Sequence, residues 1–302
     1  MPEGLLGIEN LSRDQVQAIL DRARDFQPRD GAPRKLDLLR GRMIVNLFFE
    51  TSTRTRTSFE IAAKRLGADI ISITAQASSV TKGESLVDTL NTLAAMRPDA
   101  IVMRHAASGA PHFLQRHLER PIINAGDGTH EHPTQALLDA RTILDRGASL
   151  EGLRVAIIGD IQHSRVARSN VYLLSKFGAE IVLCGPASLL PQELKQIAPG
   201  ITLTTDMREA IRDADVIMML RVQLERLNDS PFPAAEYYSF YGLRLEHLQL
   251  ARPSVIVMHP GPINRGREIS SEVADSQRSV ILNQVENGIA VRMAVLERIL
   301  GN

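Results

Sequence analysis

Residues 43–73, MIVNLFFETSTRTRTSFEIAAKRLGADIISI, contain the pattern that decides the fold. The apolar run 43–48 is typical of a strand, and a polar turn follows it. Residues 58–67 read as a helix that ends at Gly67, and residues 69–73 form a second apolar run. A strand, a helix and a strand in this order predict a right-handed crossover between two parallel strands of one sheet.

The same rhythm continues along the 302 residues, a length that suggests about two domains. We count about four short apolar strands before residue 130 and five after it, with helical segments between them. The sequence therefore predicts an α/β protein with two doubly wound parallel-sheet domains of similar size, joined by interdomain helices. The predicted domains are residues 1–133 together with 284–302, and residues 134–283.

Composition excludes several classes of protein. The 35 basic and 35 acidic side chains give a net charge of zero, which argues against a nucleic-acid partner but allows small anionic ligands. The single cysteine, Cys184, excludes an internal disulfide and a cysteine-built zinc site. No apolar run approaches about 18 residues, and the first residues do not resemble a signal peptide, so we expect a soluble, cytoplasmic protein without membrane contact.

The segment FFETSTRTRTSFE (48–60) places hydroxyl and guanidinium groups where a strand turns into a helix. Helix N-termini present free N–H groups and a partial positive charge, so they bind anions. Ser52, Thr53 and Thr55 add donors, and Arg54 and Arg56 add charge. Consecutive positions on a helix cannot all face one ligand. The alternative to an anion-binding site is a helix capped by a hydroxyl group, with the arginines exposed to solvent.

The segment GDGTHEHPTQALLDA (126–140) contains two histidines two positions apart. His130 and His132 would suit a metal ion on a strand, but Pro133 favours the first turn of a helix. No acidic or cysteine partner lies at zinc spacing, so no metal is expected. The alternatives for His132 are a neutral hydrogen-bond donor at a helix N-terminus and a buried, satisfied core histidine.

Two further segments carry polar chemistry. Residues 159–169, GDIQHSRVARS, follow a strand but lack the glycine fingerprint of dinucleotide-binding proteins, so no nicotinamide or other cofactor is expected. Residues 259–269, HPGPINRGREI, form a proline- and glycine-rich loop whose carbonyl groups can face a ligand.

The motif STRTR (52–56) after an apolar strand resembles the signature of the aspartate and ornithine carbamoyltransferase family, and HPTQ (132–135) resembles the family's HPxQ motif. The resemblance covers nearly the whole chain. One departure is Thr51 in place of the usual proline, for which we expect a small effect on rigidity. The resemblance implies that carbamoyl phosphate is bound by Ser52, Thr53, Arg54, Thr55, Arg104, His132 and Gln135. Among them, Thr55, Arg104 and His132 would polarise the carbonyl group.

The segment RVQLER (221–226) is typical of family members whose second substrate is aspartate, whereas ornithine-using members carry an SMG segment and an HCLP motif. The resemblance assigns Arg165, Arg221 and Gln223 to aspartate. Two arginines suit a substrate with two carboxylates, because each can bind one carboxylate in a bidentate manner. By resemblance, the backbone of Gly261 and Pro262 accepts hydrogen bonds from the carbamoyl nitrogen and the incoming amine.

Quaternary contacts are also implied by the resemblance. Family loops similar to residues 77–86 place a serine and a lysine in the neighbouring subunit's site, and the spacing selects Ser78 and Lys82. The expected assembly is a homotrimer with shared active sites, in which Lys82 serves both catalysis and aspartate binding. The family also pairs the glutamate matching Glu50 with arginines across the domain gap, and Arg165 and Arg226 are the candidates here.

The resulting expectation is an enzyme that transfers the carbamoyl group of carbamoyl phosphate to the α-amine of L-aspartate, giving N-carbamoyl-L-aspartate and phosphate early in pyrimidine synthesis. The motifs offer no nucleophile for a covalent intermediate. A regulatory chain or a dihydroorotase is a further expected partner. The alternatives are a non-catalytic scaffold protein, a Rossmann-type oxidoreductase, and a carbamoyltransferase for another amine.

Overall fold

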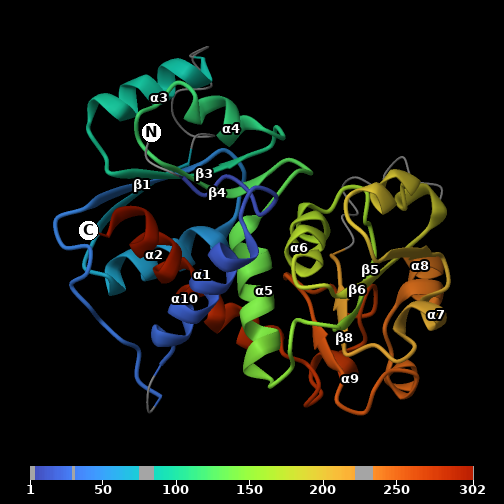
Figure 1. The fold of residues 1–302 in the computed structure, drawn as a ribbon. Helices are drawn as coiled ribbons and strands as arrows, with labels where there is room; N and C mark the ends of the chain where they lie inside the picture. The colour runs from blue at the N-terminus through green and yellow to red at the C-terminus, as the bar shows by residue number, and fades with distance from the viewer. Residues whose placement is uncertain (1–3, 29–30, 75–84, 222–233, 302) are drawn as a thin grey trace. The chain divides into compact units, whose positions relative to one another are not determined.

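The computed structural model describes residues 4–28, 31–74, 85–221 and 234–301. The chain divides into two compact units, Met1–Arg141 with Glu286–Asn302, and Thr142–Val285 (Figure 1). The boundary predicted near Pro133–Thr134 lies in the helix Pro133–Asp145, inside which the two units divide, and the predicted domain limits stay a prediction. The predicted site residues Ser78, Lys82, Gln223 and Arg226 lie outside the described residues.

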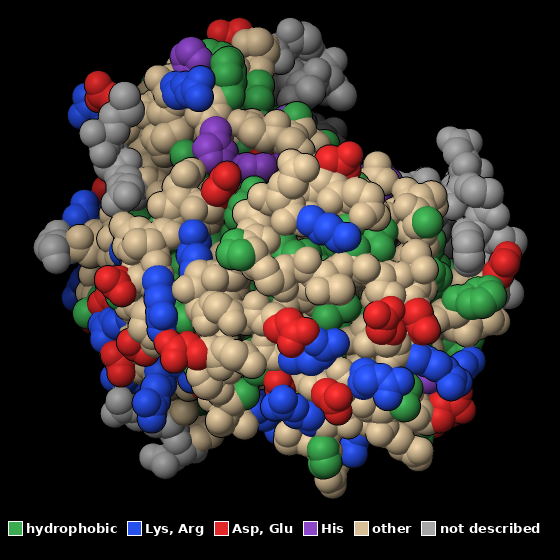
Figure 2. All heavy atoms as spheres, turned by 45° about the vertical axis from the view of Figure 1, so that its right-hand side comes forward, with side chains coloured by type: hydrophobic (Ala, Val, Ile, Leu, Met, Phe, Trp, Pro, Cys, Tyr) green, Lys and Arg blue, Asp and Glu red, His purple; other side chains and the backbone are tan. Residues whose placement is uncertain are grey.

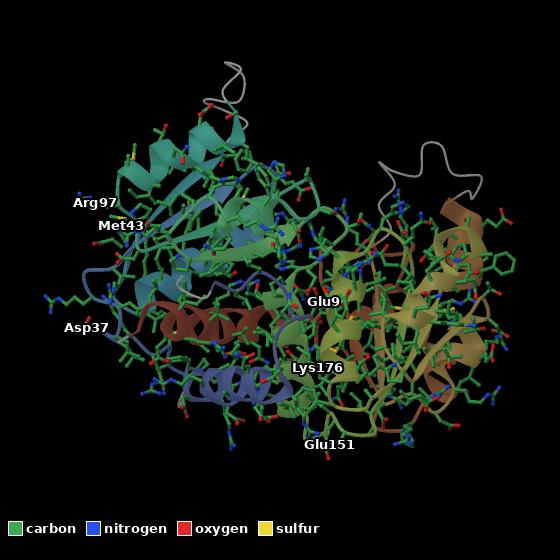
Figure 3. All side chains as sticks on the ribbon, turned by 45° about the horizontal axis from the view of Figure 1, so that its top comes forward. Glu9, Asp37, Met43, Arg97, Glu151 and Lys176 are labelled. Carbon is green, nitrogen blue, oxygen red and sulfur yellow. The ribbon has the colours of Figure 1, made fainter. Side chains whose placement is uncertain are left out.

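The first unit is built on a parallel sheet in the order β2-β1-β3-β4. Its strands are β1 (Met43–Phe48), β2 (Asp69–Thr74), β3 (Ala100–His105) and β4 (Ile122–Asp127). All three strand pairs are parallel, which confirms the crossover predicted from residues 43–73. Met43 and Arg97, labelled in Figure 3, lie near one another at the amino end of this sheet.

Helices cover both faces of the first sheet. In Figure 1, α3 (Leu86–Ala95) and α4 (Ala110–Gln115) lie on one face, and α2 (Thr53–Arg65) lies on the other. The core under α3 and α4 joins Leu90 and Leu114 to strand residues such as Leu47 and Met103. The unit also contains α1 (Arg13–Asp25), most of α5 (Pro133–Asp145) and most of α10 (Ile281–Leu300).

The second unit is built on a five-stranded parallel sheet in the order β7-β6-β5-β8-β9. Its strands are β5 (Arg154–Ile158), β6 (Glu180–Cys184), β7 (Ile201–Thr204), β8 (Val216–Met219) and β9 (Ile256–Met258). Four strands in the first sheet and five in the second agree with the sequence-based count. No helix among the described residues is long and apolar enough to span a membrane.

Helices also cover both faces of the second sheet, as expected for a doubly wound fold. Figure 1 shows α6 (Arg165–Ser175) on one face, with α7 (Met207–Ile211), α8 (Ala234–Tyr241) and α9 (Ser271–Ala274) on the other. Short 3-10 helices at Ala187–Leu189, Gln192–Gln196 and Leu245–Gln249 complete the described helical segments. The core on the α7 and α8 side includes Cys184, whose pKa is raised to about 12 by burial, so this thiol is not ionised at neutral pH.

Strand order places the candidate site residues of each unit. The strand order reverses beside β1 in the first sheet and beside β5 in the second. Doubly wound sheets bind ligands outside the carboxyl ends of their strands at such reversals. The polar segments identified in the sequence follow β1, β3 and β4 in the first unit, and β5, β8 and β9 in the second.

Candidate active site

The N-terminus of α2 presents the hydroxyl-rich segment that follows β1. Ser52 occupies the N-cap position, yet its side chain makes no capping hydrogen bond. Thr53 and Arg54 are exposed in the first turn, and Thr55 is buried. The first N–H groups of a helix lack intrahelical partners, so they and the Ser52 hydroxyl together can donate hydrogen bonds to an anion.

Arg56 points away from this group and belongs to the supporting structure. Its guanidinium donates to Oγ1 of Thr74 on β2 at 3.3 Å and lies 3.7 Å from the Glu60 carboxylate one helical turn later. Arg54, by contrast, makes no hydrogen bond or ion pair with any other residue in the described part of the chain. Of the two arginines in the motif, the structure therefore leaves Arg54 available to a ligand.

Arg104 lies at the carboxyl end of β3, directly beside the end of β1, where it pairs in register with Phe48. Its Nε donates to the Glu50 carboxylate at 3.0 Å, and Nη1 donates to the Ala125 carbonyl at 3.4 Å. Both side chains of the ion pair are mostly buried. Glu50 thus orients Arg104 within the first unit, while the interdomain partners predicted for Glu50 stay a prediction.

Asp127 holds the loop that leads from β4 to His132. This fully buried carboxylate accepts hydrogen bonds from the backbone N–H groups of Gly109 and Glu131 and from the Asn124 amide. It also lies 3.0 Å from Nδ1 of His130. Burial alone would raise the pKa of Asp127, but the hydrogen bonds lower it overall, so the carboxylate is ionised at neutral pH.

Glu131 ties the same loop to the start of the chain. Its buried carboxylate accepts from the backbone N–H of Ile8 at 2.8 and 2.9 Å and from that of Glu9 at 3.1 Å (Glu9 is labelled in Figure 3). The sequence-based prediction did not include Glu131. The only sequence signal was an acidic residue between two histidines, which does not reveal partners 123 positions away.

His132 and Gln135 lie at the beginning of α5, as the HPTQ pattern predicts, and both are buried. The His132 carbonyl accepts from the backbone N–H of Gln135, which closes the first helical turn. The Gln135 side-chain amide donates to Oδ1 of Asp139 at 2.9 Å, which fixes the orientation of the Gln135 side chain. This arrangement places an imidazole and an amide at one helix N-terminus in the first unit.

Arg292 on α10 supplies buried positive charge that interacts with Asp139, the hydrogen-bond partner of Gln135. It is buried, donates to the Gly288 carbonyl at 2.8 Å, and lies over the Phe59 ring at 5.2 Å. Burial lowers the pKa of Arg292 to about 10, against the opposing effect of the Asp139 carboxylate. The guanidinium therefore stays charged at neutral pH and offsets the buried charge of Asp139.

In the second unit, a close backbone approach joins the ends of β5 and β8. Gly159 has a φ of 141°, and a Cβ at this position would lie 2.9 Å from Cβ of Leu220. The Leu220 N–H donates to the Ile158 carbonyl at 2.8 Å. The half-buried Arg221 directly follows Leu220 and therefore lies beside the turn that joins β5 to α6.

Arg165 is the first residue of α6 and is half-buried. The preceding Ser164 caps the helix by accepting from the Ala167 N–H at 3.1 Å. Asp160 accepts from the His163 N–H at 3.1 Å, which fixes the turn between β5 and the helix. Arg165 begins the helix that follows β5, and Arg221 follows the neighbouring strand β8. Two arginines so connected suit a ligand with two carboxylates.

The loop after β9 is held by a buried pair, His259 and Glu268. Nδ1 of His259 accepts from the Gly261 N–H at 2.8 Å, so the ring proton lies on Nε2, which is 3.2 Å from Glu268 Oε1. Gly261 has a φ of 69°, a conformation that favours glycine, and its peptide bond to Pro262 is cis. The backbone carbonyl groups predicted to face the substrate therefore belong to a fixed loop.

Comparisons with known proteins agree with this arrangement. The model of the aspartate/ornithine carbamoyltransferase carbamoyl-phosphate-binding domain matches residues 4–145, and that of the Asp/Orn-binding domain matches residues 151–299. An aspartate carbamoyltransferase catalytic subunit of Solibacter usitatus is 79% identical over 302 residues, 100% of each chain. The corresponding subunit of Geobacter sulfurreducens is 54% identical and covers 98% of this chain and 96% of its own.

A solved structure of aspartate transcarbamoylase from Trypanosoma cruzi, in complex with carbamoyl aspartate and phosphate, has a TM-score of 0.90 and 33% identity. The alignment covers 99% of this chain and 96% of that one. Both domain models and the full-length relatives point to the same family. The chain belongs to the aspartate/ornithine carbamoyltransferase family.

Proposed function

We propose that this chain transfers the carbamoyl group of carbamoyl phosphate to the α-amine of L-aspartate and releases N-carbamoyl-L-aspartate and phosphate. The relatives named above are aspartate carbamoyltransferase catalytic subunits, and the solved relative binds carbamoyl aspartate and phosphate. In this chain, RVQ at 221–223 and Pro260 in place of the cysteine of the HCLP motif favour aspartate over ornithine. The reaction belongs to de novo pyrimidine synthesis.

One observation carries the proposal. The uncapped N-terminus of α2 leaves Ser52, Thr53 and Arg54 accessible, and Arg104 lies at the end of the adjacent strand. We propose that the helix end binds the phosphate of carbamoyl phosphate, with Thr55 and Arg104 reaching the carbonyl oxygen. Phosphate binding at a helix N-terminus draws on unpaired N–H groups and on the helix dipole.

The chemical step needs no covalent enzyme intermediate. The aspartate amine attacks the carbonyl carbon, a C–N bond forms, and the C–O bond to phosphate breaks. Thr55, Arg104 and His132 stabilise the oxyanion that develops, and Gln135 holds the carbamoyl group. The proton lost by the amine leaves on the departing phosphate, so no protein base is required. Catalysis rests on placing two anions correctly and on positive charge already in position.

Aspartate binding is assigned to the second unit. Arg165 and Arg221 bind its two carboxylates, together with Gln223 from outside the described residues. The backbone of Gly261 and Pro262 accepts hydrogen bonds from the carbamoyl nitrogen and the amine. The closure role of Glu50 with Arg165 and Arg226 stays part of this proposal.

The proposed assembly is a cytoplasmic homotrimer in which Ser78 and Lys82 complete the site of a neighbouring subunit. Ile71 supports self-association, because it is an apolar side chain 53% exposed on the edge strand β2. A regulatory chain or a dihydroorotase is a further proposed partner, and no cofactor is required.

A substrate panel tests the reaction. The purified chain is supplied with carbamoyl phosphate and, separately, with aspartate, ornithine or N-acetylornithine, and phosphate release is measured. We expect turnover with aspartate that exceeds the other rates by at least about 10³-fold, since a site built for two carboxylates leaves its arginines unpaired with the other amines. Equal or faster turnover with another amine would refute the assignment of aspartate, and no turnover at all would favour a scaffold protein.

Mixed subunits test the shared site. Lys82→Ala and Arg54→Ala chains are each inactive in this proposal, but a mixed trimer contains sites that lack neither residue. Recovered activity after subunit exchange is the expected result. If exchange is verified by mass spectrometry and activity does not recover, each site is built from one chain.

A further inference from the structure

His112, Asp127 and His130 form a cluster in the first unit, outside the residues assigned to the substrates. His112 lies on the short helix α4, and the other two lie on the loop between β4 and α5. One nitrogen of each imidazole and one carboxylate oxygen of Asp127 all lie within 4.8 Å of one another. Two imidazoles and a carboxylate from two separate segments thus converge on one place.

The cluster contains a buried polar atom without a partner. Nδ1 of His112 is shielded from solvent and has no hydrogen-bond partner in the described part of the chain. The ring lies 5.3 Å from the His130 ring, centroid to centroid, at an interplanar angle of 71°. A buried unpaired nitrogen is costly, and an ion is one of the few groups that can satisfy it.

The protonation states suit metal binding. Burial lowers the pKa of His112, and the neighbouring His130 lowers it further, so this imidazole is neutral at pH 7. The pKa of Asp127 is also lowered, which keeps the carboxylate charged. Metal ions bind neutral imidazole and ionised carboxylate, so both groups are in the required form before the ion arrives.

We propose that His112, Asp127 and His130 bind a divalent transition-metal ion of the zinc class. Two imidazoles and one carboxylate are donors that Zn²⁺ and Co²⁺ accept, whereas Mg²⁺ and Ca²⁺ prefer oxygen alone. Three protein ligands leave a fourth position for water in a tetrahedral site.

The distances fit after a small adjustment. Ligand atoms in a tetrahedral zinc site lie roughly 3.3 Å apart, given metal–ligand distances of about 2.0 Å. Nδ1 of His130 and Oδ2 of Asp127 are already 3.0 Å apart. The His112 nitrogen has to approach by up to about 1.5 Å to reach that spacing, a shift within the reach of a rotamer change by a side chain that is not fully buried.

The hydrogen bonds of Asp127 support the carboxylate as a ligand. Besides His130, it accepts from the N–H groups of Gly109 and Glu131 and from the Asn124 amide. The ion takes the place of the proton shared with His130 and leaves the other three donors as supports that orient the carboxylate. Such supporting hydrogen bonds are typical of metal ligands.

The bound ion would join two segments beside the catalytic groups. His130 lies two positions before His132, and His112 lies on a different helix, so the ion fixes α4 to the loop that begins α5. Figure 2 shows several histidine side chains, in purple, on the visible face of the molecule. The site is structural, and no step of carbamoyl transfer passes through the metal.

The sequence did not predict this site. No metal was expected because His130 and His132 lie in one segment without a further ligand at zinc spacing. In the structure the second imidazole comes from His112, and Asp127 three positions before His130 supplies the carboxylate. The fold, rather than local spacing, creates the ligand set.

The test is metal binding by the full chain after removal of bound metal with a chelator. Zn²⁺ is titrated by calorimetry in the wild type, His112→Gln and His130→Asn, with His117→Gln as the control for an exposed histidine outside the cluster. We expect one Zn²⁺ per chain in the wild type and in the control. Each cluster variant should bind at least about 10-fold more weakly, as expected when a ligand is lost.

Two further measurements keep the result specific. Co²⁺ should give intense visible absorption bands typical of a tetrahedral site in the wild type and lose them in both cluster variants, while Mg²⁺ should not compete. Zn²⁺ should raise the melting temperature of the wild type and the control only. Equal Zn²⁺ affinity in the wild type and in either cluster variant, or no saturable binding below about 100 μM, would overturn the proposal. Asp127→Asn is avoided because the Asp127 carboxylate accepts three other hydrogen bonds that stabilise the fold.

Discussion

The Glu50 carboxylate accepts a hydrogen bond from Nε of Arg104 at 3.0 Å, and the two residues lie at the carboxyl ends of neighbouring parallel strands. The Arg104 side chain is 14% exposed and that of Glu50 is 22% exposed, so the ion pair is largely shielded from solvent screening. A guanidinium held at one nitrogen by Glu50 presents its remaining donors in a fixed direction. We therefore predict that Glu50 acts on carbamoyl phosphate by positioning Arg104.

Replacing Glu50 tests this positioning role. Glu50→Ala should lower kcat at least about tenfold and raise KM for carbamoyl phosphate, because Arg104 loses its orientation. Glu50→Gln retains an acceptor for Nε of Arg104, so its kcat should fall less than that of Glu50→Ala. Initial rates with each substrate varied separately give both parameters. A rise confined to KM for aspartate would contradict positioning and would support the interdomain role instead.

Arg54→Ala should lower kcat by about 10³-fold or more, because the transition state loses a cation that binds the departing phosphate. The melting temperature should stay unchanged, since Arg54 is exposed. Arg56→Ala is the matched control on the same helix, where the side chain contacts Thr74 and Glu60. Its kcat should stay near that of the wild type. Near-normal turnover in Arg54→Ala would refute the phosphate-binding role.

His132→Ala should lower kcat by about 10²- to 10³-fold and change KM much less, as expected for a group that stabilises charge mainly in the transition state. Steady-state kinetics with saturating aspartate separate the two effects. The result would contradict oxyanion stabilisation if KM rose while kcat stayed constant.

Arg292→Met should lower the free energy of unfolding by about 3 kcal/mol or more, because it removes the cation that opposes the buried charge of Asp139. The contact with the Phe59 ring is lost as well. Arg298→Met on the same helix is the exposed control and should cost under about 0.5 kcal/mol. Urea unfolding monitored by circular dichroism gives both values. Equal stability of the two variants would show that Arg292 does not offset Asp139.

The second unit should lose stability as pH falls below about 6.5, the ordinary pKa of histidine. Burial and the nearby Arg244 lower the pKa of the buried His247, so the unfolded chain binds more protons than the folded one in this range. Nδ1 of His247 accepts from the Arg244 N–H at 3.1 Å, a bond that protonation would remove.

His247→Gln is the variant that checks this pH dependence. Its unfolding free energy should fall less between pH 7.5 and pH 5.5 than that of the wild type. Urea unfolding at both pH values, with His163→Gln as the control for a partly exposed histidine, measures the difference. Identical slopes for the wild type and His247→Gln would assign the effect to other groups.

Local patterns made much of the fold predictable. The strands and helices of residues 43–73 follow from apolar runs separated by a polar turn, and both sheets have the predicted number of strands. The placement of Ser52 to Thr55 at a helix N-terminus also needs only local sequence, because one turn of helix fixes it.

Long-range contacts could not be predicted in the same way. Glu131 caps two backbone N–H groups 122 and 123 positions earlier, and Arg292 offsets Asp139 from the other end of the chain. Gly159 is required by the approach of Leu220, which becomes visible only when β5 and β8 are paired. Each of these depends on which segments the sheets bring together, and residue spacing does not contain that information.

The division of the chain has a consequence for its biosynthesis. Residues 142–285 are contiguous, so the second unit has all its strands and helices before the last segment leaves the ribosome. The first unit does not, because Arg22 on α1 pairs with Glu297 on α10 at 2.6 Å and Gln27 donates to Asn287. Domains fold as units during synthesis. The unit that begins the chain is therefore the later one to be completed, because α1 gains its partners on α10 only after the second unit has been made.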